Sequence, residues 1–247
     1  LSACNAEVWN QKSTVLKGMK WMSQKSAPLL LNPSFSVHKY AWLMEFLGNI
    51  KHYEANTHET VRLALLARQR LFEIADKESI DFNLEKRGIL HFYHNKQDYD
   101  VAIRVNDLLN KGGLERSGVS NEEIKQIEPT LTGEYYAGFY CEGDATGDIH
   151  KYTTGLAEVT KKLGVKYRFG MDVTDIEHLT SGVEVKLQPS SENVELLPNE
   201  VEMLAADAVV VCAGVGSYQL AELVQERVNV YPVKGYSITV MLNDEES

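Results

Sequence analysis

The chain has 247 residues, of which 44% are hydrophobic and 24% are charged. These proportions are ordinary for one or two folded domains and exclude a collagen-like, coiled-coil or disordered chain. Its 25 Lys and Arg against 35 Asp and Glu give a formal net charge of -10. This balance argues against a nucleic acid as partner, because recognition of phosphate needs a basic surface.

Neither a disulfide framework nor a metal site is expected. The three cysteines, Cys4, Cys141 and Cys212, are odd in number and lie far apart, with no Cys-x-x-Cys pair or Cys/His cluster. Such cysteine usage fits a reducing compartment, the cytoplasm. The sequence also lacks the run of roughly 18 apolar residues that a membrane-spanning helix needs.

The first half of the chain is expected to be mainly helical. Residues 1–36 contain two prolines and predict irregular structure. Apolar residues at helical spacing predict helices over 37–50, 57–79 and 97–111. Alternating and aromatic residues predict strands over 88–94 and 135–141. The second of these helices has an apolar stripe, formed by Leu63, Leu66, Leu71 and Ile74.

Two further helices carry signals at their ends. Ser120-Asn121-Glu122-Glu123 is a capping box, which predicts a short helix that ends before Pro129. A turn rich in Gly and Asp, residues 143–148, precedes a helix that is expected over 151–163 and is stopped by Gly164.

The second half is expected to be rich in strands. Residues 165–169 predict a short strand, and a meander follows over 173–178, 182–187 and 201–204. The continuous apolar run 208–212 predicts a strand that is covered on both faces. Together with a helix near Ser217 and strands over 228–231 and 236–242, this order predicts a mixed α/β plus α+β architecture.

The segment Gly214-Val215-Gly216-Ser217-Tyr218-Gln219 is half of a dinucleotide-binding fingerprint. It follows an apolar run and opens a helix, but Gln219 stands where the third glycine belongs, and no acidic residue follows at the distance that ribose binding requires. A tight turn that lines a cofactor and a turn that serves packing alone are both open alternatives. A nicotinamide enzyme built on this turn is a less favoured hypothesis.

Histidine and acidic residues give weaker signals. His91 and His94 are three positions apart, which on a strand places them on opposite faces, so a shared metal is disfavoured. Asp144, Asp148 and His150 lie around one turn. A catalytic dyad there is the alternative to capping of the following helix by Asp148, which is the favoured interpretation.

One segment has the composition of a membrane-surface helix. Residues 15–31 combine lysines with Met, Trp and Leu, although a linker that packs on the core is the favoured interpretation. No Gly-x-Ser-x-Gly, Walker or His-Glu-x-x-His motif occurs, so a hydrolase or P-loop function lacks support.

Five passages together resemble the flavin-dependent D-amino acid oxidase/dehydrogenase superfamily, and within it the bacterial D-amino acid dehydrogenases. The first, Ser2-Ala3-Cys4-Asn5-Ala6, is similar to the family's Ser-x-x-Asn-Ala-Gly loop, with Glu7 in place of the glycine. Glu7 places a side chain where glycine allows close approach. The other four passages lie at 16–29, 119–131, 146–173 and, as a pair, 206–214 with 231–237.

The resemblance implies part of a Rossmann-like FAD-binding domain of the glutathione-reductase type, with an inserted substrate domain of antiparallel sheet and helices. Family members begin upstream and continue downstream, so this chain, which starts at Leu1 without Met, is expected to be an internal section. The implied division is a flavin-domain loop and linker, the first part of the substrate domain, the FAD-binding domain and a return to the substrate domain, at 1–27, 28–142, 143–225 and 226–247.

The resemblance also implies which residues bind the cofactor FAD. The loop residues would lie near the flavin or the pyrophosphate, and the backbone of Val173 would contact the adenine end. The expected cofactor-binding residues are Ser2, Asn5, Ala6, Val173, Ala213, Gly214 and Ser217. On the substrate side it implies Lys234, Gly235 and Tyr236, with packing an equal alternative for Tyr236. No catalytic residue is assigned.

The implied function is oxidation of the C–N bond of a D-amino acid or related amine by hydride transfer to FAD. The implied partners are that amine or amino acid and an electron acceptor, either oxygen or a quinone reached by peripheral membrane association. The expected location is the cytoplasm or the inner face of the membrane. The alternatives are a non-catalytic ligand-binding module on the same scaffold and a glycine, sarcosine or hydroxyproline-type amine oxidase.

Overall fold

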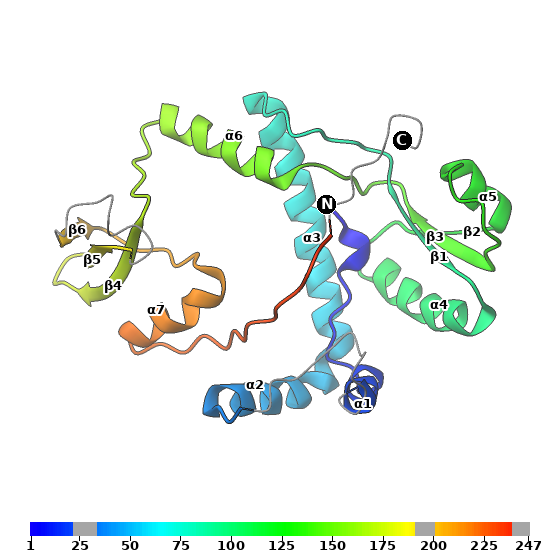
Figure 1. The fold of residues 1–247 in the computed structure, drawn as a ribbon, viewed down its shortest axis with the longest axis horizontal. Coiled ribbons are helices and arrows are strands. Elements are labelled where there is room, and N and C mark those ends of the chain that lie inside the picture. Colours follow the sequence, from blue (N-terminus) through cyan, green and yellow to red (C-terminus); the bar gives the residue numbers. More distant parts are fainter. Residues whose placement is uncertain (22–33, 191–200, 239–247) are drawn as a thin grey trace. The chain divides into compact units, whose positions relative to one another are not determined.

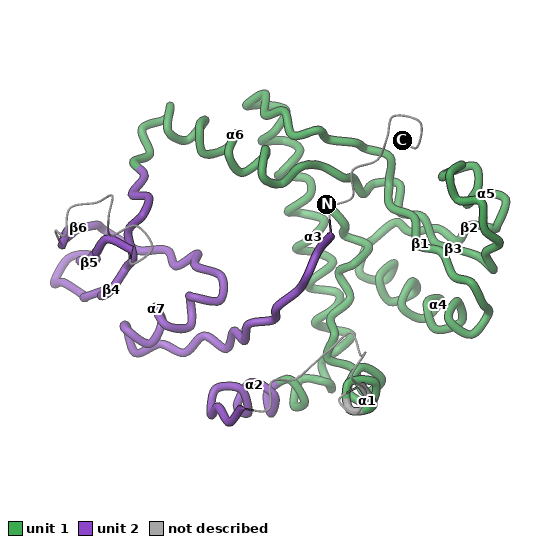
Figure 2. Tube along the Cα trace, in the orientation of Figure 1, with its two compact units in different colours: residues 1–32, 46–166 green, residues 33–45, 167–247 purple. Residues whose placement is uncertain are grey.

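The structure is a computed structural model, which describes residues 1–21, 34–190 and 201–238. The chain divides into two compact units, and each is described by itself. The first unit consists of Leu1–Asn32 and Phe46–Lys166, and the second consists of Pro33–Glu45 and Tyr167–Ser247 (Figure 2).

The first unit is mainly helical (Figure 1). Its helical elements are η1 (Ala3–Asn5), α1 (Lys12–Trp21), η2 (Asn49–His52), α3 (Tyr53–Glu78), α4 (Lys96–Lys111), α5 (Asn121–Ile127) and α6 (Ile149–Lys162). The helix α2 (Val37–Gly48) begins in the second unit and ends in the first. The expectation of irregular structure over 1–36 is wrong for α1, because the two prolines that suggested it lie beyond the end of this helix.

The first unit also contains a small antiparallel sheet. Its strands are ordered β1-β3-β2, with bounds Ile89–Tyr93, Ala137–Cys141 and Ser117–Val119. Tyr99 of α4 stacks on Phe139, with ring centroids 5.1 Å apart. Ile124 of α5 is fully buried and lies over Gly138, whose missing side chain leaves room for it. Since neighbouring strand residues point to opposite faces, the two helices cover the two faces of the sheet.

The helix α3 buries a different stripe from the predicted one. Leu71 packs against the core, as expected. The other three residues of the stripe are 55%, 45% and 37% exposed, namely Leu63, Leu66 and Ile74. Val61 is fully buried instead, in a cluster with Ala3 and Leu109. Packing of η1 and α4 on this side of the helix therefore decides which residues are buried.

The signals at the helix ends are confirmed. The Ser120 hydroxyl accepts a hydrogen bond from the Glu123 N–H, and the Glu123 carboxylate accepts one from the Ser120 N–H, which completes the capping box. The Asp148 carboxylate accepts from the Lys151 N–H at 3.0 Å and so caps α6. This capping role is the one that the sequence favoured for Asp148.

The second unit contains the predicted meander. Strands β4 (Met171–His178), β5 (Val183–Pro189) and β6 (Glu202–Ala206) pair antiparallel in the order β4-β5-β6. The short turn η3 (Gly214–Gly216) leads into α7 (Ser217–Leu223), which contacts β4. The buried side of the meander is formed by Ile176, Val183, Val185 and Leu187.

Several predicted strands do not form in the described part of the chain. Residues 165–169, 208–212, 228–231 and 236–238 have no strand assignment, and residues 239–242 lie outside the described residues. The run 208–212 is exposed throughout, with Val210 at 82%. A strand buried on both faces needs neighbours on both sides, and none of the described strands pairs with this run. Apolar composition alone therefore gave the wrong prediction.

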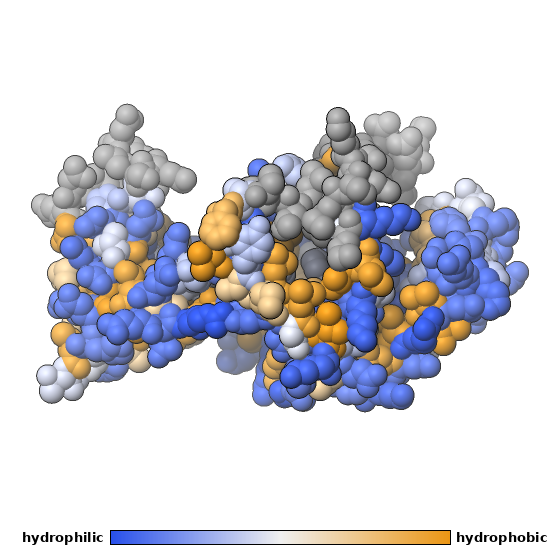
Figure 3. All heavy atoms as spheres, turned by 90° about the horizontal axis from the view of Figure 1, so that it is seen from below, coloured by the Kyte–Doolittle hydropathy of each residue, from blue (hydrophilic) through white to orange (hydrophobic). Residues whose placement is uncertain are grey.

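Apolar side chains also reach the surface elsewhere. On the face drawn in Figure 3, hydrophobic atoms are interspersed with hydrophilic ones in both units. Within the described ranges, no helix has both the length and the apolar character that a bilayer span requires. Of the predicted membrane-surface segment only α1 is described, and residues 22–31 lie outside the described residues.

Candidate functional site

The predicted cofactor loop, residues 2–6, is part of the core of the first unit. Ala3, Cys4 and Ala6 are at most 6% exposed and belong to one cluster. The same cluster contains Val61 of α3 and Cys141 of β3. Small side chains at these positions allow the loop to pack closely against the helix and the sheet. The loop is therefore fixed in place by packing.

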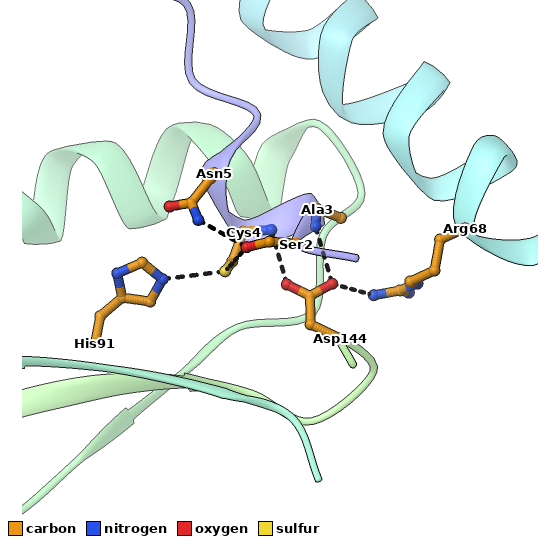
Figure 4. Close-up of polar contacts among 7 residues, drawn as sticks. All are labelled: Ser2, Ala3, Cys4, Asn5, Arg68, His91 and Asp144. Atoms are coloured by element: carbon orange, nitrogen blue, oxygen red, sulfur yellow. Dashed lines mark hydrogen bonds and ion pairs between the residues drawn. The ribbon is translucent and has the colours of Figure 1, made fainter. Parts of the chain in front are cut away.

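A buried carboxylate holds this loop from below (Figure 4). Asp144 is fully buried and accepts the backbone N–H of Ala3 at 3.0 Å and that of Cys4 at 2.9 Å. Its Oδ1 atom also accepts from Nη1 of Arg68, on α3, at 2.6 Å. Sequence reasoning considered Asp144 only as part of a dyad and missed this role. No local signal could reveal it, because the partners are 76 to 141 positions away.

The surroundings of Asp144 keep it ionised. Burial raises the pKa of this carboxyl group, but hydrogen bonds from the thiol and N–H of Cys4, from Arg68 and from the N–H of Ala3 outweigh burial. The pKa of Asp144 is consequently lowered below its ordinary value. A buried negative charge is tolerated here because it is paired and hydrogen-bonded.

Asp144 also determines what the loop can offer to a ligand. The N–H groups of Ala3 and Cys4 are bound by Asp144, while those of Asn5 and Ala6 donate to the carbonyl oxygens of Ser2 and Ala3. These four donors are therefore used within the protein and are not free to bind a phosphate. The polar group of the loop that faces solvent is the side chain of Asn5, which also donates to the Ser2 hydroxyl at 2.7 Å.

A thiol and an imidazole meet beside the loop. Sγ of Cys4 lies 3.0 Å from Nε2 of His91 and 3.0 Å from Oγ of Ser2 (Figure 4). A hydrogen bond to Cys141 and burial raise the pKa of the Cys4 thiol. The same hydrogen bond lowers the pKa of Cys141, although burial opposes it.

Glu7, which replaces the glycine of the resembled loop, has its own partners. Its Oε1 atom accepts from the hydroxyl of Tyr53 at 2.5 Å and from Nε2 of Gln11 at 2.9 Å. Burial and the hydrogen bond to Glu7 raise the pKa of Tyr53, so the phenol stays protonated and donates. The carboxylate that departs from the family pattern is thus held by α3 and by the chain just before α1.

A hollow of about 200 Å³ lies between the start of the chain and α3. Its lining is mostly small and apolar, with one guanidinium, and is formed by Leu1, Ser2, Ala3, Ala64, Ala67, Arg68 and Leu71. The hollow therefore lies next to the loop and next to the arginine that pairs with Asp144.

The other predicted cofactor residues gather in the second unit. Val173 lies on β4, at a bulge, and β4 forms one edge of the described meander. Ala213 precedes η3, and Ser217 begins α7, which contacts β4. Gly214 has a φ of +56°, and a Cβ built on it would meet nothing within 4 Å. This backbone is open to a ligand and has the left-handed conformation that favours glycine.

The predicted substrate-side residues lie in extended chain. Tyr236 is 88% exposed, and the ammonium of Lys234 lies 5.4 Å from the centroid of its ring. Gly235, between them, has open space where a Cβ would be. Packing therefore does not account for Tyr236 in this structure. In the described residues no group of three or more His, Cys, Asp or Glu is placed to hold a metal ion.

Two of these features, the β4 edge at Val173 and the open turn at Gly214, present main chain. An exposed strand edge and an open glycine turn suit an extended ligand that contacts main chain. The loop, whose backbone donors are occupied, suits a flat ring that contacts side chains and carbonyl groups.

Comparison with known proteins identifies the family of the chain. Residues 34–246 match the family described as FAD dependent oxidoreductase. D-amino acid dehydrogenase 3 of Mesorhizobium japonicum is 50% identical over 243 residues, which cover 98% of this chain and 57% of the relative. D-amino acid dehydrogenase of Paramagnetospirillum magneticum is 32% identical over 99% of this chain and 57% of its own length. The chain thus spans little more than half of these relatives.

Solved structures show the fold. Glycine oxidase from Geobacillus kaustophilus superposes with a TM-score of 0.56 at 21% identity, over 66% of this chain and 42% of that one. L-amino acid deaminase from Proteus vulgaris, without its specific insertion, gives 0.57 at 19% identity, over 69% and 43%. The expected fold class is confirmed. By the match over residues 34–246, this chain belongs to the family of FAD-dependent oxidoreductases.

Proposed function

We propose that this chain serves in the oxidation of the C–N bond of a D-amino acid, or of a closely related amine. The observation that carries the proposal is the 50% identity to a D-amino acid dehydrogenase over 98% of the chain. FAD, when bound, supplies the acceptor for the hydride. The protein's part is to bind, orient and exclude water.

In this proposal the loop at residues 2–6 lies against the flavin ring and not against the pyrophosphate. Four consecutive backbone donors of the loop are already occupied, whereas Asn5 is exposed and Ser2 orients it. Ala6 contributes a small, buried side chain that keeps the loop flat against the core. Asp144 and Arg68 position the loop from behind.

The second unit would hold the nucleotide part of the cofactor. The bulged edge of β4 offers the backbone of Val173 to the adenine. The turn at Ala213, Gly214 and Ser217 offers main chain with no side chain in the way at Gly214. The exposed Lys234, Gly235 and Tyr236 are assigned to the substrate side.

The proposed division of the chain follows these roles. It gives a flavin loop and linker, a first part of the substrate domain, the FAD-binding part and a return to the substrate domain, at 1–27, 28–142, 143–225 and 226–247. The proposed location is the cytoplasm or the inner face of the membrane, with oxygen or a quinone as electron acceptor. The three cysteines, which are free in this structure, support a reducing compartment.

The test joins this chain to the flanking segments of the Mesorhizobium relative, because the chain spans 57% of that relative. The purified chimera is expected to carry the absorption spectrum of bound flavin. Anaerobic addition of a D-amino acid is expected to bleach it, while the L-enantiomer leaves it unchanged. Bleaching by glycine or sarcosine alone would overturn the substrate, and flavin that no amine reduces would indicate a non-catalytic ligand-binding module.

A variant tests the turn of the second unit. Gly214→Val places a branched side chain into open space that the proposal gives to FAD, and we expect it to weaken FAD binding at least tenfold, about 1.4 kcal/mol. Gly164→Val is the matched control, because Gly164 also has a positive φ and open space around it but lies outside the proposed site. Equal FAD affinity in the two variants would contradict the assignment.

A further inference from the structure

Glu7 is a fixed carboxylate that the proposed function does not use. It follows the loop at residues 2–6 directly and is half-buried. Its Oε1 atom accepts from the hydroxyl of Tyr53 at 2.5 Å and from Nε2 of Gln11 at 2.9 Å. Among the described residues, no basic side chain forms an ion pair with Glu7, and its Oε2 atom has no partner.

The two donors fix the position of this carboxylate but do not neutralise it. A phenol and an amide are uncharged donors, and the pKa of Tyr53 is raised by burial and by the hydrogen bond to Glu7, so the phenol keeps its proton. A charge that is partly removed from water is stabilised when an opposite charge pairs with it. The free Oε2 atom of Glu7 is therefore a place for a positively charged group.

Two neighbours of Glu7 have the same preference for a donor or a cation. Trp9 is 72% exposed, and the face of an indole attracts an ammonium or a guanidinium. Asn10 is 9% exposed, and its buried Oδ1 atom has no hydrogen-bond donor among the described residues. The segment 7–10 thus contains a carboxylate, an exposed indole and an amide oxygen without a donor, and it contains no basic residue. This chemistry suits an organic cation.

We propose that Glu7 selects substrates that carry a positive charge on their side chain, namely D-amino acids that end in an ammonium or a guanidinium group. The inference rests on the proposed function, in which residues 2–6 lie against the flavin ring. The substrate Cα must also lie against that ring, because its hydride passes to the flavin. Glu7 is the next residue of the chain, so its carboxylate lies beside the substrate and can bind the end of the side chain.

The α-amino group of the substrate is a poor partner for Glu7. When the hydride leaves Cα with the electron pair of the C–H bond, the nitrogen lone pair forms the C=N bond, so the amine must be neutral at that moment. A carboxylate paired with this nitrogen would favour its protonated form and oppose the reaction. A cation at the end of the side chain stays charged throughout. Its pairing with Glu7 is equal in the ground state and the transition state, so it strengthens binding without changing the rate of reduction.

The test compares D-lysine with D-hydroxynorleucine, in which a hydroxyl replaces the terminal ammonium. Anaerobic reduction of the flavin in the FAD-loaded chimera gives the substrate Kd and the limiting rate separately. We expect D-lysine to bind about tenfold to 100-fold more tightly, the range for a hydrogen bond between charged groups, with similar limiting rates. Glu7→Gln keeps an oxygen for Tyr53 and Gln11 but removes the charge, and it should abolish the difference in Kd.

Glu54→Gln is the matched control. It removes the same charge from an exposed carboxylate next to Tyr53 and should retain the preference for D-lysine. The absorption spectrum of bound flavin verifies each variant. Salt gives a second readout on the parent chimera, because screening between about 0.05 M and about 0.5 M salt should weaken the preference. This measurement decides the question if Glu7→Gln does not retain FAD.

The outcomes separate this inference from the proposed function. Equal Kd values for the two substrates, both of which reduce the flavin, would overturn the role of Glu7 and leave the proposed function intact. A preference for D-lysine that persists in Glu7→Gln, or one that salt does not weaken, would also overturn this role. Flavin that no D-amino acid reduces would overturn the proposed function, and the role of Glu7 with it.

Discussion

At the scale of single residues, Asp144 shows how a distant contact determines a local structure. Its two oxygens bind the backbone of Ala3 and Cys4, and one also binds Arg68. The resemblance places residues 2–6 near FAD, and this placement stays a prediction. The carboxylate that holds them could not be predicted, because an Asp in a turn after a strand has the same local pattern whether it caps, pairs or is free in solvent.

Removal of the Asp144 charge should destabilise the first unit. Asp144→Asn leaves the Arg68 guanidinium, which is 20% exposed, without its counter-charge, and such a loss costs about 3 kcal/mol. Urea unfolding, monitored by a probe in the first unit, measures this loss of unfolding free energy. Glu73→Gln removes the carboxylate of the exposed Arg70–Glu73 pair and should leave the midpoint unchanged. Equal midpoints for the two variants would contradict the assignment of a structural ion pair.

The same residue predicts a dependence on pH. The folded-state pKa of Asp144 lies below its ordinary value of 3.8, so its contribution is complete above that value and is lost as the pH falls through the folded pKa. The stability difference between the parent chain and Asp144→Asn should therefore be constant from about pH 7 to about pH 5 and shrink below about pH 4. Unfolding curves across this range measure it, and a difference that grows on acidification would refute the sign.

At the scale of elements, local signals predicted well and non-local ones did not. Capping by Ser120 and Asp148, which needs only neighbouring residues, is confirmed. The meander is confirmed as well, because its strands are joined by short turns and pair with one another. The strand predicted over 208–212 is not formed, because a strand needs a neighbouring strand with which its backbone can form hydrogen bonds. The prediction of which apolar residues of α3 are buried is partly wrong, because the packing of η1 and α4 against α3 determines its buried side.

The capping box gives a prediction at this scale. Ser120→Ala leaves the Glu123 N–H without its acceptor and should lower the unfolding free energy of the first unit by about 1 kcal/mol. Ser120→Asp keeps an acceptor at the same place and should retain most of the stability. Hydrogen exchange over α5 is the local measurement. Faster exchange in the Asp variant than in the Ala variant would contradict the role of the cap.

A second prediction concerns the turn between β4 and β5. Gly182 has a φ of +89°, and a Cβ there would lie 2.3 Å from the carbonyl oxygen of Ala206. Gly182→Ala combines backbone strain with this clash and should cost more than about 2 kcal/mol in the second unit. Gly214→Ala, with a positive φ but open space, should cost about 1 kcal/mol. Thermal unfolding of both variants compares them, and equal losses would mean that the meander relaxes around the new methyl group.

At the scale of the whole molecule, the fold class and family could be inferred from the sequence because five separate passages kept their order along the chain. Family membership and the mixed architecture are confirmed. Whether the apolar run 208–212 is buried or exposed could not be predicted in the same way. Burial of a strand depends on which other strands are present, and the chain spans only 57% of the Mesorhizobium relative.

This exposure leads to the last prediction. Val209, Val210 and Val211 are 40%, 82% and 38% exposed, and such apolar surface is stabilised when other chain covers it, by about 25 cal/mol per Å². In the chimera with the flanking segments of the Mesorhizobium relative, their amides should exchange hydrogen far more slowly than in this chain alone. The meander, already paired in both proteins, is the internal control. Fast exchange at Val209–Val211 in a chimera that binds FAD would mean that the run 208–212 is not a strand of the cofactor domain, even where the rest of the domain is complete.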